Sequence, residues 1–191
     1  MYNRALHFHF TGIGGSGMSG LAEILIDQGF KVSGSDISIN EACKELMVKG
    51  AVIFQGHSEK NLSEEVSILV YSSAVSFSNP EVVEAKKRKI PVIARAEVLA
   101  ELMRLKFGVG VAGSHGKTTT TSMTATILEK AGKDPTVVIG GKVKALGSGG
   151  KLGKSDFLVA ETDESDRSFL LLKPTIAIIT NIDAEHMNAY S

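Results

Sequence analysis

The chain has 191 residues, enough for one large domain or two smaller ones with buried cores. Its 21 basic and 21 acidic residues cancel, which argues against general attraction to nucleic acid or to an anionic membrane. The single cysteine, Cys43, excludes an internal disulfide, and no apolar run approaches the ~20 residues of a membrane span. We therefore expect a cytoplasmic protein, in which any bound anion is held by a local group of residues.

Strand-like and helical patterns alternate over the first hundred residues. A strand at 6–11 leads into a glycine cluster and then into a helix with one apolar stripe: Met18, Leu21, Ala22, Leu25 and Ile26. Further strands are predicted at 30–35, 51–54, 66–72 and 91–94, and further helices at 40–49, 80–89 and 97–106. This alternation predicts a parallel sheet in an α/β domain.

The same order restarts at Phe107. A strand at 108–112 leads into a second glycine loop and a helix at 117–131, with an inward face of Thr120, Met123, Ile127, Leu128 and Ala131. Strands at 135–139, 156–161 and 175–181 and a loop at 140–153 follow. We therefore predict a Rossmann-like domain at 1–106 and a partial P-loop α/β domain at 107–191.

The first glycine cluster, residues 12–17, fits the pattern G-x-G-x-x-G between a strand and a helix. Glycines there permit a tight turn, and amides at the helix start can face a diphosphate. Asp36, 24 residues after Gly12, could accept hydrogen bonds from a ribose. The fingerprint alone indicates NAD or another nucleotide diphosphate, or else glycines that only permit close packing.

The second cluster, residues 113–119, reads Gly-Ser-His-Gly-Lys-Thr-Thr. The loop amides and the Lys117 ammonium could surround the β and γ phosphates of a nucleoside triphosphate, while the Thr118 hydroxyl could ligate Mg²⁺. The loop is two residues shorter than a standard Walker A motif, because its upstream glycine is Gly113. We interpret it as a phosphate-binding loop.

An acidic segment, residues 161–166, follows the strand at 156–161. Carboxylates at the carboxyl end of a parallel strand face the ligand edge of the sheet, so Glu161 is the favoured Mg²⁺ ligand. His186, after the last strand, is a second candidate beside a structural interpretation. His7, His9 and His57 are interpreted as structural.

Taken in order, these segments resemble the Mur ligases. The resemblance rests on both glycine loops, on the acidic segment and on shorter stretches: Met18–Glu23, Gly34–Asp36, Ser72–Ala74, Arg95–Glu97, Thr180–Ile182 and His186–Met187. It covers essentially all 191 residues. It implies an ATP-dependent, amide-bond-forming ligase of peptidoglycan precursor synthesis, most similar to the members that join L-alanine to UDP-N-acetylmuramate.

The resemblance also assigns ligands to the two loops. UDP-N-acetylmuramate, rather than NAD, would be bound by Gly12, Ile13, Gly14, Gly15, Ser16, Gly17, Met18, Asp36 and Ser73. ATP would be bound by Gly113, Ser114, His115, Gly116, Lys117, Thr118, Thr119 and Asn181. Lys117, Glu161 and His186 would be catalytic, and Thr118, Glu161 and His186 would hold one or two Mg²⁺ ions.

The chain departs from the family pattern in three residues and in length. Ser114, Thr162 and Asn188 stand where threonine, alanine and aspartate are usual. Mur ligases have three domains, so we expect an incomplete ligase, inactive alone, that needs a carboxyl-terminal domain or a homo-oligomer partner. The alternatives are a non-catalytic nucleotide-binding module, a murein tripeptide ligase and an NAD-dependent oxidoreductase.

Overall fold

A computed structural model of the chain describes residues 6–140, 149–162 and 168–184. The chain forms two compact units, Met1–Arg95 and Ala96–Ser191. This division falls at the start of a helix, Arg95–Arg104, whereas the domain boundary that the sequence predicts, near residue 106, follows the end of that helix. The domain limits 1–106 and 107–191 stay a prediction.

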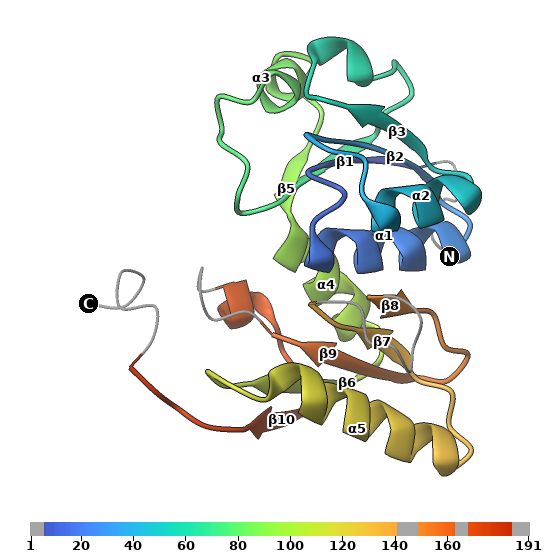
Figure 1. Ribbon diagram of the computed structural model, residues 1–191, viewed down its shortest axis with the longest axis vertical. Coiled ribbons are helices and arrows are strands. Elements are labelled where there is room, and N and C mark those ends of the chain that lie inside the picture. Colours follow the sequence, from blue (N-terminus) through green and yellow to red (C-terminus); the bar gives the residue numbers. More distant parts are fainter. Residues whose placement is uncertain (1–5, 141–148, 163–167, 185–191) are drawn as a thin grey trace. The chain divides into compact units, whose positions relative to one another are not determined.

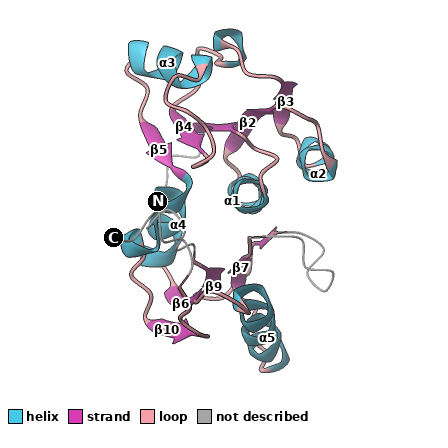
Figure 2. Cartoon of the chain, turned by 60° about the vertical axis from the view of Figure 1, so that its left-hand side comes forward, coloured by secondary structure: helices cyan, strands magenta, loops and turns pink. Residues whose placement is uncertain are grey.

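The first unit is a parallel sheet with helices on both faces. Its elements are β1 (His7–Thr11), α1 (Ser16–Asp27), β2 (Lys31–Asp36), α2 (Glu41–Val48), β3 (Val52–Gln55), η1 (Glu59–Asn61), β4 (Ile68–Tyr71), α3 (Pro80–Lys87) and β5 (Val92–Ala94). The strand order is β3-β2-β1-β4-β5, and all neighbours are parallel. Figure 2 shows α1 and α2 on one face and α3 on the other. The predicted α/β alternation is confirmed here.

Helix α1 confirms most of its predicted stripe. Met18, Leu21, Ala22 and Leu25 are buried, but Ile24 is buried in place of Ile26, which is half-buried. The helix ends where Gly29 adopts a positive φ of 90° and donates its N–H to the Ile26 carbonyl. At its other end, α1 begins at Ser16, so its N-terminus directly follows the first residues of the glycine cluster at 12–17.

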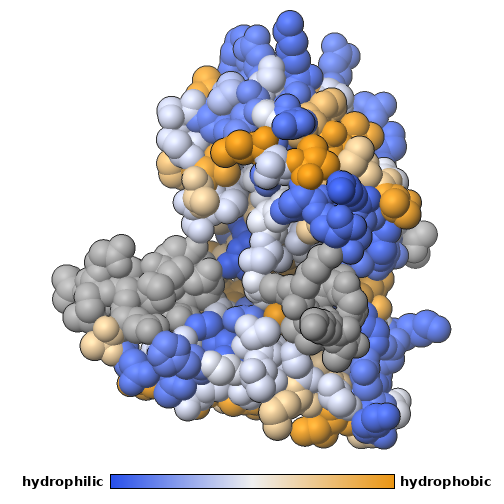
Figure 3. All heavy atoms as spheres, viewed as in Figure 1, coloured by the Kyte–Doolittle hydropathy of each residue, from blue (hydrophilic) through white to orange (hydrophobic). Residues whose placement is uncertain are grey.

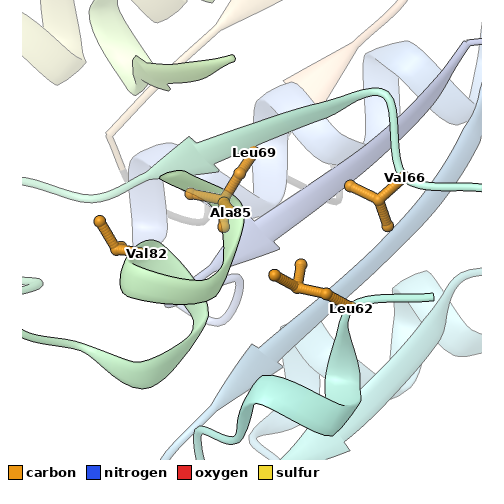
Figure 4. Close-up of a cluster of buried hydrophobic side chains, with 5 residues drawn as sticks. All are labelled: Leu62, Val66, Leu69, Val82 and Ala85. Carbon is orange, nitrogen blue, oxygen red and sulfur yellow. The ribbon is translucent and has the colours of Figure 1, made fainter. Parts of the chain in front are cut away.

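Helix α3 is fixed to the sheet by an apolar cluster of Leu62, Val66, Leu69, Val82 and Ala85 (Figure 4). Two of these residues come from α3, one from β4 and two from the segment between η1 and β4. Burying side chains of this size contributes about 1.5–3 kcal/mol for each large one. The first turn of α3 is therefore held firmly against the sheet.

The second unit is built in the same way. It contains α4 (Arg95–Arg104), β6 (Phe107–Ala112), α5 (Lys117–Lys130), β7 (Thr136–Val138), β8 (Gly150–Lys151), β9 (Phe157–Glu161), η2 (Ser168–Leu171) and β10 (Ile176–Ile179). The strand order is β10-β6-β9-β7-β8, with every neighbour parallel except the short β8, which lies in the predicted loop at 140–153 (Figure 1). The strand β6 before the glycine loop lies between β10 and β9.

The predicted inward face of α5 is wrong. The helix buries Thr121 and Ala125, whereas Met123 and Ile127 are 60% and 65% exposed. Small residues four positions apart let the helix lie close to β9 and β6, which a stripe of long side chains would prevent. The larger apolar residues therefore lie on the surface of this unit.

Apolar side chains are also exposed at the edge of the second sheet. Ile176 and Ile179 on the edge strand β10 are 47% and 62% exposed. Figure 3 shows small apolar patches among polar surface at the lower edge of the view. Within the described ranges, no helix is both long and apolar enough to cross a membrane.

Candidate functional site

The first glycine loop lies in a pocket at the carboxyl edge of the first sheet. The pocket has a volume of about 490 Å³, a size typical of sites for small ligands. Residues that follow β1, β2, β3 and β4 line it: Gly12, Gly14, Gly15, Asp36, Ile37, Asn40, His57, Ser72, Ala74, Val75, Ser76, Ser78 and Asn79. In open α/β sheets, ligands bind at this edge, where the strand order reverses.

The amides of this loop are mostly used within the protein. The N–H groups of Gly12 and Ile13 donate to the Ser35 carbonyl at 2.8 and 3.0 Å, and Gly15 N–H donates to the Gly12 carbonyl at 3.2 Å. Gly12 has a φ of 84°, which only glycine adopts easily. The amides of Ser16 and Gly17, in the first turn of α1, are those that a helix cannot satisfy internally. A diphosphate would therefore be met at the helix start rather than along the whole loop.

Asp36 is turned toward the glycine loop. Its Oδ2 accepts the Gly14 N–H at 2.8 Å, and its Oδ1 accepts the Ser38 N–H at 3.3 Å. Asn40 supports the same turn by donating Nδ2–H to the Gly14 carbonyl at 2.9 Å. The carboxylate thus fixes the shape of the loop, in addition to any contact with a ligand.

Three other predicted substrate residues differ in exposure. The side chains of Ile13 and Met18 are buried in the core, at 0% and 1% exposed, so only their backbone can face a ligand. Ser73 is exposed and lies between Ser72 and Ala74, which line the pocket. Of the predicted substrate residues, Gly12, Gly14, Gly15 and Asp36 line this pocket, and the predicted role of the whole group in binding stays a prediction.

The sequence analysis missed a buried polar network beneath this pocket. At its centre is Glu81, in the first turn of α3, which is 0% exposed. Its carboxylate accepts hydrogen bonds from Thr11, Ser35, His9, Asn61 and the Ser58 N–H, at 2.6–3.3 Å. Burial alone would raise the pKa of Glu81, but the hydrogen bonds from His9, Ser35 and Asn61 lower it to about 2.

This network reaches the pocket through His57, which the sequence analysis interprets as structural. His57 Nδ1 lies 2.8 Å from Ser35 Oγ, and Ser35 Oγ donates to Glu81 at 2.6 Å. The partners are 22 and 46 residues apart in the sequence, so no local pattern could reveal them.

The second glycine loop is tightly packed against the end of β10. Gly113 has a φ of 129°, and a Cβ there would collide with Thr180 and with the Asn181 backbone. The Lys117 ammonium donates to the carbonyls of Gly113 and Ser114. The Lys117 ammonium, which is predicted to neutralise phosphates, therefore lies against the backbone of the loop that would surround those phosphates.

Thr118 and Glu161 lie next to each other, as their predicted joint role requires. Thr118 Oγ1 is 3.1 Å from each carboxylate oxygen of Glu161, and the Gly140 N–H donates to Glu161 at 3.0 Å. A hydroxyl and a carboxylate are the hard oxygen ligands that Mg²⁺ prefers beside phosphates. The donor set fits a magnesium ion that completes its coordination with phosphate and water. Among the described residues, no group of three or more His, Cys, Asp and Glu side chains could hold a metal by itself.

Asn181 holds the backbone of the second glycine loop. Its Oδ1 accepts the His115 N–H at 2.9 Å, and its Nδ2 donates to the His115 carbonyl at 3.0 Å. Thr180 Oγ1 donates to the same carbonyl at 2.6 Å. The Asn181 side chain is thus bonded to the backbone of the second glycine loop. Its predicted contact with the nucleotide stays a prediction.

Part of the predicted site lies outside the described residues. This applies to His186 and to residues 163–166 of the acidic segment. Their predicted roles stay predictions.

Comparisons with known proteins agree with this geometry. The profile "Mur ligase family, catalytic domain" matches residues 7–107, and "Mur ligase middle domain" matches residues 111–191. Proteins named UDP-N-acetylmuramate–L-alanine ligase are 59% identical in Geobacter sp. (strain M21), over 191 residues, and 60% identical in Myxococcus xanthus, over 186 residues. These alignments cover 100% and 97% of this chain but only 41% and 39% of the relatives.

Solved structures give the same result. The crystal structure of UDP-N-acetylmuramate-alanine ligase from Thermotoga maritima has a TM-score of 0.91 and 34% identity, covering 97% of this chain and 43% of that one. The UDP-N-acetylmuramate:L-alanyl-gamma-D-glutamyl-meso-diaminopimelate ligase from Neisseria meningitides has a TM-score of 0.88 and 31% identity, covering 97% and 63%. The predicted fold class and family are confirmed: the chain belongs to the Mur ligase family.

Proposed function

We propose that this chain supplies the UDP-sugar-binding and ATP-binding parts of a cytoplasmic UDP-N-acetylmuramate–L-alanine ligase. Residues 1–106 would bind UDP-N-acetylmuramate, and residues 107–191 would bind ATP with Mg²⁺. The chain spans 41% of the length of a curated relative that bears this name, so the amino acid would be bound by residues outside it. The observation that carries the proposal is the pairing of Thr118 with Glu161 beside Lys117, at the edge of a parallel sheet.

The first unit would bind the UDP part of its substrate by shape more than by charge. The pocket is lined by Gly12, Gly14 and Gly15, directly before the first turn of α1, where a diphosphate would be met, and Asp36 keeps the glycine loop in place. Ser72 and Ala74, which line the pocket, and Ser73 between them would lie along the substrate.

The reaction that this family supports consists of two displacements. A lactyl carboxylate oxygen attacks the γ-phosphorus of ATP, the bond to the β–γ bridging oxygen breaks, and ADP leaves. The alanine amine then attacks the acyl carbon of the resulting acyl phosphate, the carbon–oxygen bond to phosphate breaks, and the amine loses a proton. No protein nucleophile is required.

The residues of this chain would contribute by binding and orienting the triphosphate. Lys117 would neutralise the β and γ phosphates, and the loop amides would fix their orientation. Bound Mg²⁺, held by Thr118 and Glu161 and, by family resemblance, His186, would withdraw charge from the phosphate oxygens. The two hydrogen bonds between the Asn181 side chain and the His115 backbone would keep the loop rigid during this step.

Calorimetric titration of the 191-residue chain tests both binding assignments. We expect it to bind UDP-N-acetylmuramate and, separately, Mg²⁺-ATP, and to show no binding of NADH by fluorescence. Binding of the free tripeptide L-alanyl-gamma-D-glutamyl-meso-diaminopimelate in preference to L-alanine would favour a murein peptide ligase, the activity that the name of the Neisseria relative gives for that protein. Failure to bind any UDP ligand would contradict the proposal.

Activity distinguishes a ligase part from a complete enzyme. We expect the chain alone to release no alanine-dependent phosphate above a Lys117→Ala blank, because water must be excluded around an acyl phosphate. Alanine-dependent release would show that the 191 residues suffice.

A further inference from the structure

Ser35 connects the buried carboxylate of Glu81 to the histidine of the first pocket. It is a buried residue of β2, and its Oγ contacts both side chains, at 2.6 Å to Glu81 and 2.8 Å to His57 Nδ1. His57 lines the pocket, with its side chain 19% exposed. The direction in which the Ser35 hydroxyl proton points therefore decides which hydrogen bond Ser35 can form with His57, a residue of the pocket.

The direction of the hydrogen bonds follows from their chemistry. An ionised carboxylate can only accept, so Ser35 must donate its single proton to Glu81. The Ser35 oxygen can then only accept from His57, which requires a proton on His57 Nδ1. In the neutral imidazole, Nε2 is left without a proton. Since Nδ1 is turned inward to Ser35, Nε2 lies on the opposite edge of the ring.

We infer that Glu81, acting through Ser35, is a positioning residue that fixes the tautomer of His57, so that Nε2 faces the pocket as a hydrogen-bond acceptor. This inference rests on the proposed function for the identity of the ligand. The matching groups on a UDP ligand are its neutral donors, the ribose hydroxyls and the uracil imide N–H. Asp36, a carboxylate residue that also lines this pocket, accepts hydrogen bonds from the amides of Gly14 and Ser38.

The surroundings of Glu81 make this arrangement robust. Its Oε1 accepts from Asn61 at 2.7 Å and from the Ser58 N–H at 3.3 Å, while Oε2 accepts from Ser35, Thr11 and His9. The low pKa of Glu81, about 2, means that the carboxylate stays ionised at neutral pH. The Ser35 proton therefore has a permanent acceptor.

Glu81→Gln should reverse the direction of these bonds. The amide oxygen is expected to stay near the Ser58 N–H, a donor that cannot rotate, which places the amide NH₂ beside Ser35 and Thr11. Those hydroxyls can rotate to accept, and the Ser35 proton is then free to turn toward His57 Nδ1. We expect His57 to change from the Nδ1–H to the Nε2–H tautomer.

Long-range ¹H–¹⁵N correlation NMR of the ligand-free chain reads this tautomer directly. At about pH 8, where an ordinary histidine is neutral, we expect Nδ1–H for His57 in the wild type. We expect Nε2–H in Glu81→Gln and a mixture in Ser35→Ala. Ser33→Ala is the matched control, because Ser33 is also buried on β2 but bridges His7 and His9. A His57 tautomer that is the same in all four proteins would overturn the inference.

Calorimetry with UDP gives the second measurement. Ser35→Ala should weaken binding by about three- to tenfold, the equivalent of one hydrogen bond, and Ser33→Ala should not. In a His57→Ala background, Ser35→Ala should have no further effect on UDP affinity. An equal loss of affinity in both backgrounds would show that Ser35 acts otherwise than through His57.

If Glu81→Gln fails to fold, Ser35→Ala still decides the question. If the wild type does not bind UDP, the proposed function fails, while the NMR measurement still tests the tautomer.

Discussion

The two glycine loops of this chain each follow a strand of a mainly parallel sheet, yet they present different chemical groups. The first loop uses its amides mostly for internal hydrogen bonds, and the Asp36 side chain accepts the Gly14 amide. The second loop brings an ammonium, a hydroxyl and a carboxylate together at Lys117, Thr118 and Glu161. The same strand-loop-helix unit therefore has a loop whose amides are mostly bonded internally in one unit, and a loop that carries an ammonium, a hydroxyl and a nearby carboxylate in the other.

The support beneath the loops differs as well. The first pocket lies over a buried polar network around Glu81, whose bonds join β1, β2, η1 and α3. The second loop is held at His115, whose N–H donates to Asn181 and whose carbonyl accepts from Thr180 and Asn181. Disturbing the first support should therefore affect the stability of a whole unit, whereas disturbing the second should affect mainly one loop.

The largest effect is expected from Glu81→Gln on the stability of the first unit. Burial raises the pKa of Glu81, but its hydrogen bonds lower it from 4.5 to about 2, which corresponds to roughly 3 kcal/mol in favour of the folded state. Because the folded pKa is depressed, this contribution is fully present above pH ~4.5 and is lost as the pH falls through ~2. Hydrogen exchange of the β1 and β2 amides measures it.

The control for this prediction is Glu41→Gln. Glu41 also lies in the first turn of a helix with an asparagine N-cap, but it is exposed. We expect less than about 0.5 kcal/mol for it. Equal hydrogen-exchange protection of the β1 amides in Glu81→Gln and Glu41→Gln would show that the polar network around Glu81 does not stabilise the first unit.

The next largest effect is expected from Lys117→Ala on ATP binding. Charge-assisted hydrogen bonds contribute about 1.5–3 kcal/mol, so the affinity for Mg²⁺-ATP should fall by roughly 10- to 150-fold. Lys130→Ala, at the far end of α5, is the control and should bind as the wild type does. UDP binding should be unchanged in both variants. An unaltered Mg²⁺-ATP titration for Lys117→Ala would mean that the second loop is only structural.

How much the sequence could predict depends on how local the determinants are. Both loops and nearly all strands follow from patterns within about ten residues, which is why the fold class and the family could be identified. The role of His57 could not, because its partners Ser35 and Glu81 are brought close only by the folded sheet. The inward face of α5 was predicted wrongly, since hydrophobicity favoured Met123 and Ile127 over the small residues that permit close packing.

A smaller effect is expected from Asp36→Ala on UDP binding. The variant loses the bond that holds the Gly14 amide at 2.8 Å, so the loop gains conformational freedom that binding must remove. Calorimetry should show about a tenfold loss of UDP affinity, with Mg²⁺-ATP binding unchanged. Asp27→Ala, at the other end of α1, serves as control. If both variants bind UDP equally well, Asp36 has no part in shaping the pocket.

The smallest effect is expected from the residues that hold the second loop. Asn181→Ala removes both bonds to the His115 backbone, and the affinity for Mg²⁺-ATP should fall by about three- to tenfold, because Lys117 and Thr118 remain. Thr180→Val should cost less, since Asn181 still donates to the carbonyl that Thr180 no longer reaches.

Hydrogen exchange separates loosening of the loop from loss of a nucleotide contact. The His115 amide, which donates to Asn181 at 2.9 Å, should exchange faster in Asn181→Ala than in Thr180→Val, even without ATP. If ATP binding weakens while His115 exchange stays at the wild-type rate, Asn181 contacts the nucleotide directly instead of holding the loop. If neither changes, the second loop needs no support from β10, and its shape depends on Gly113 and Gly116 alone.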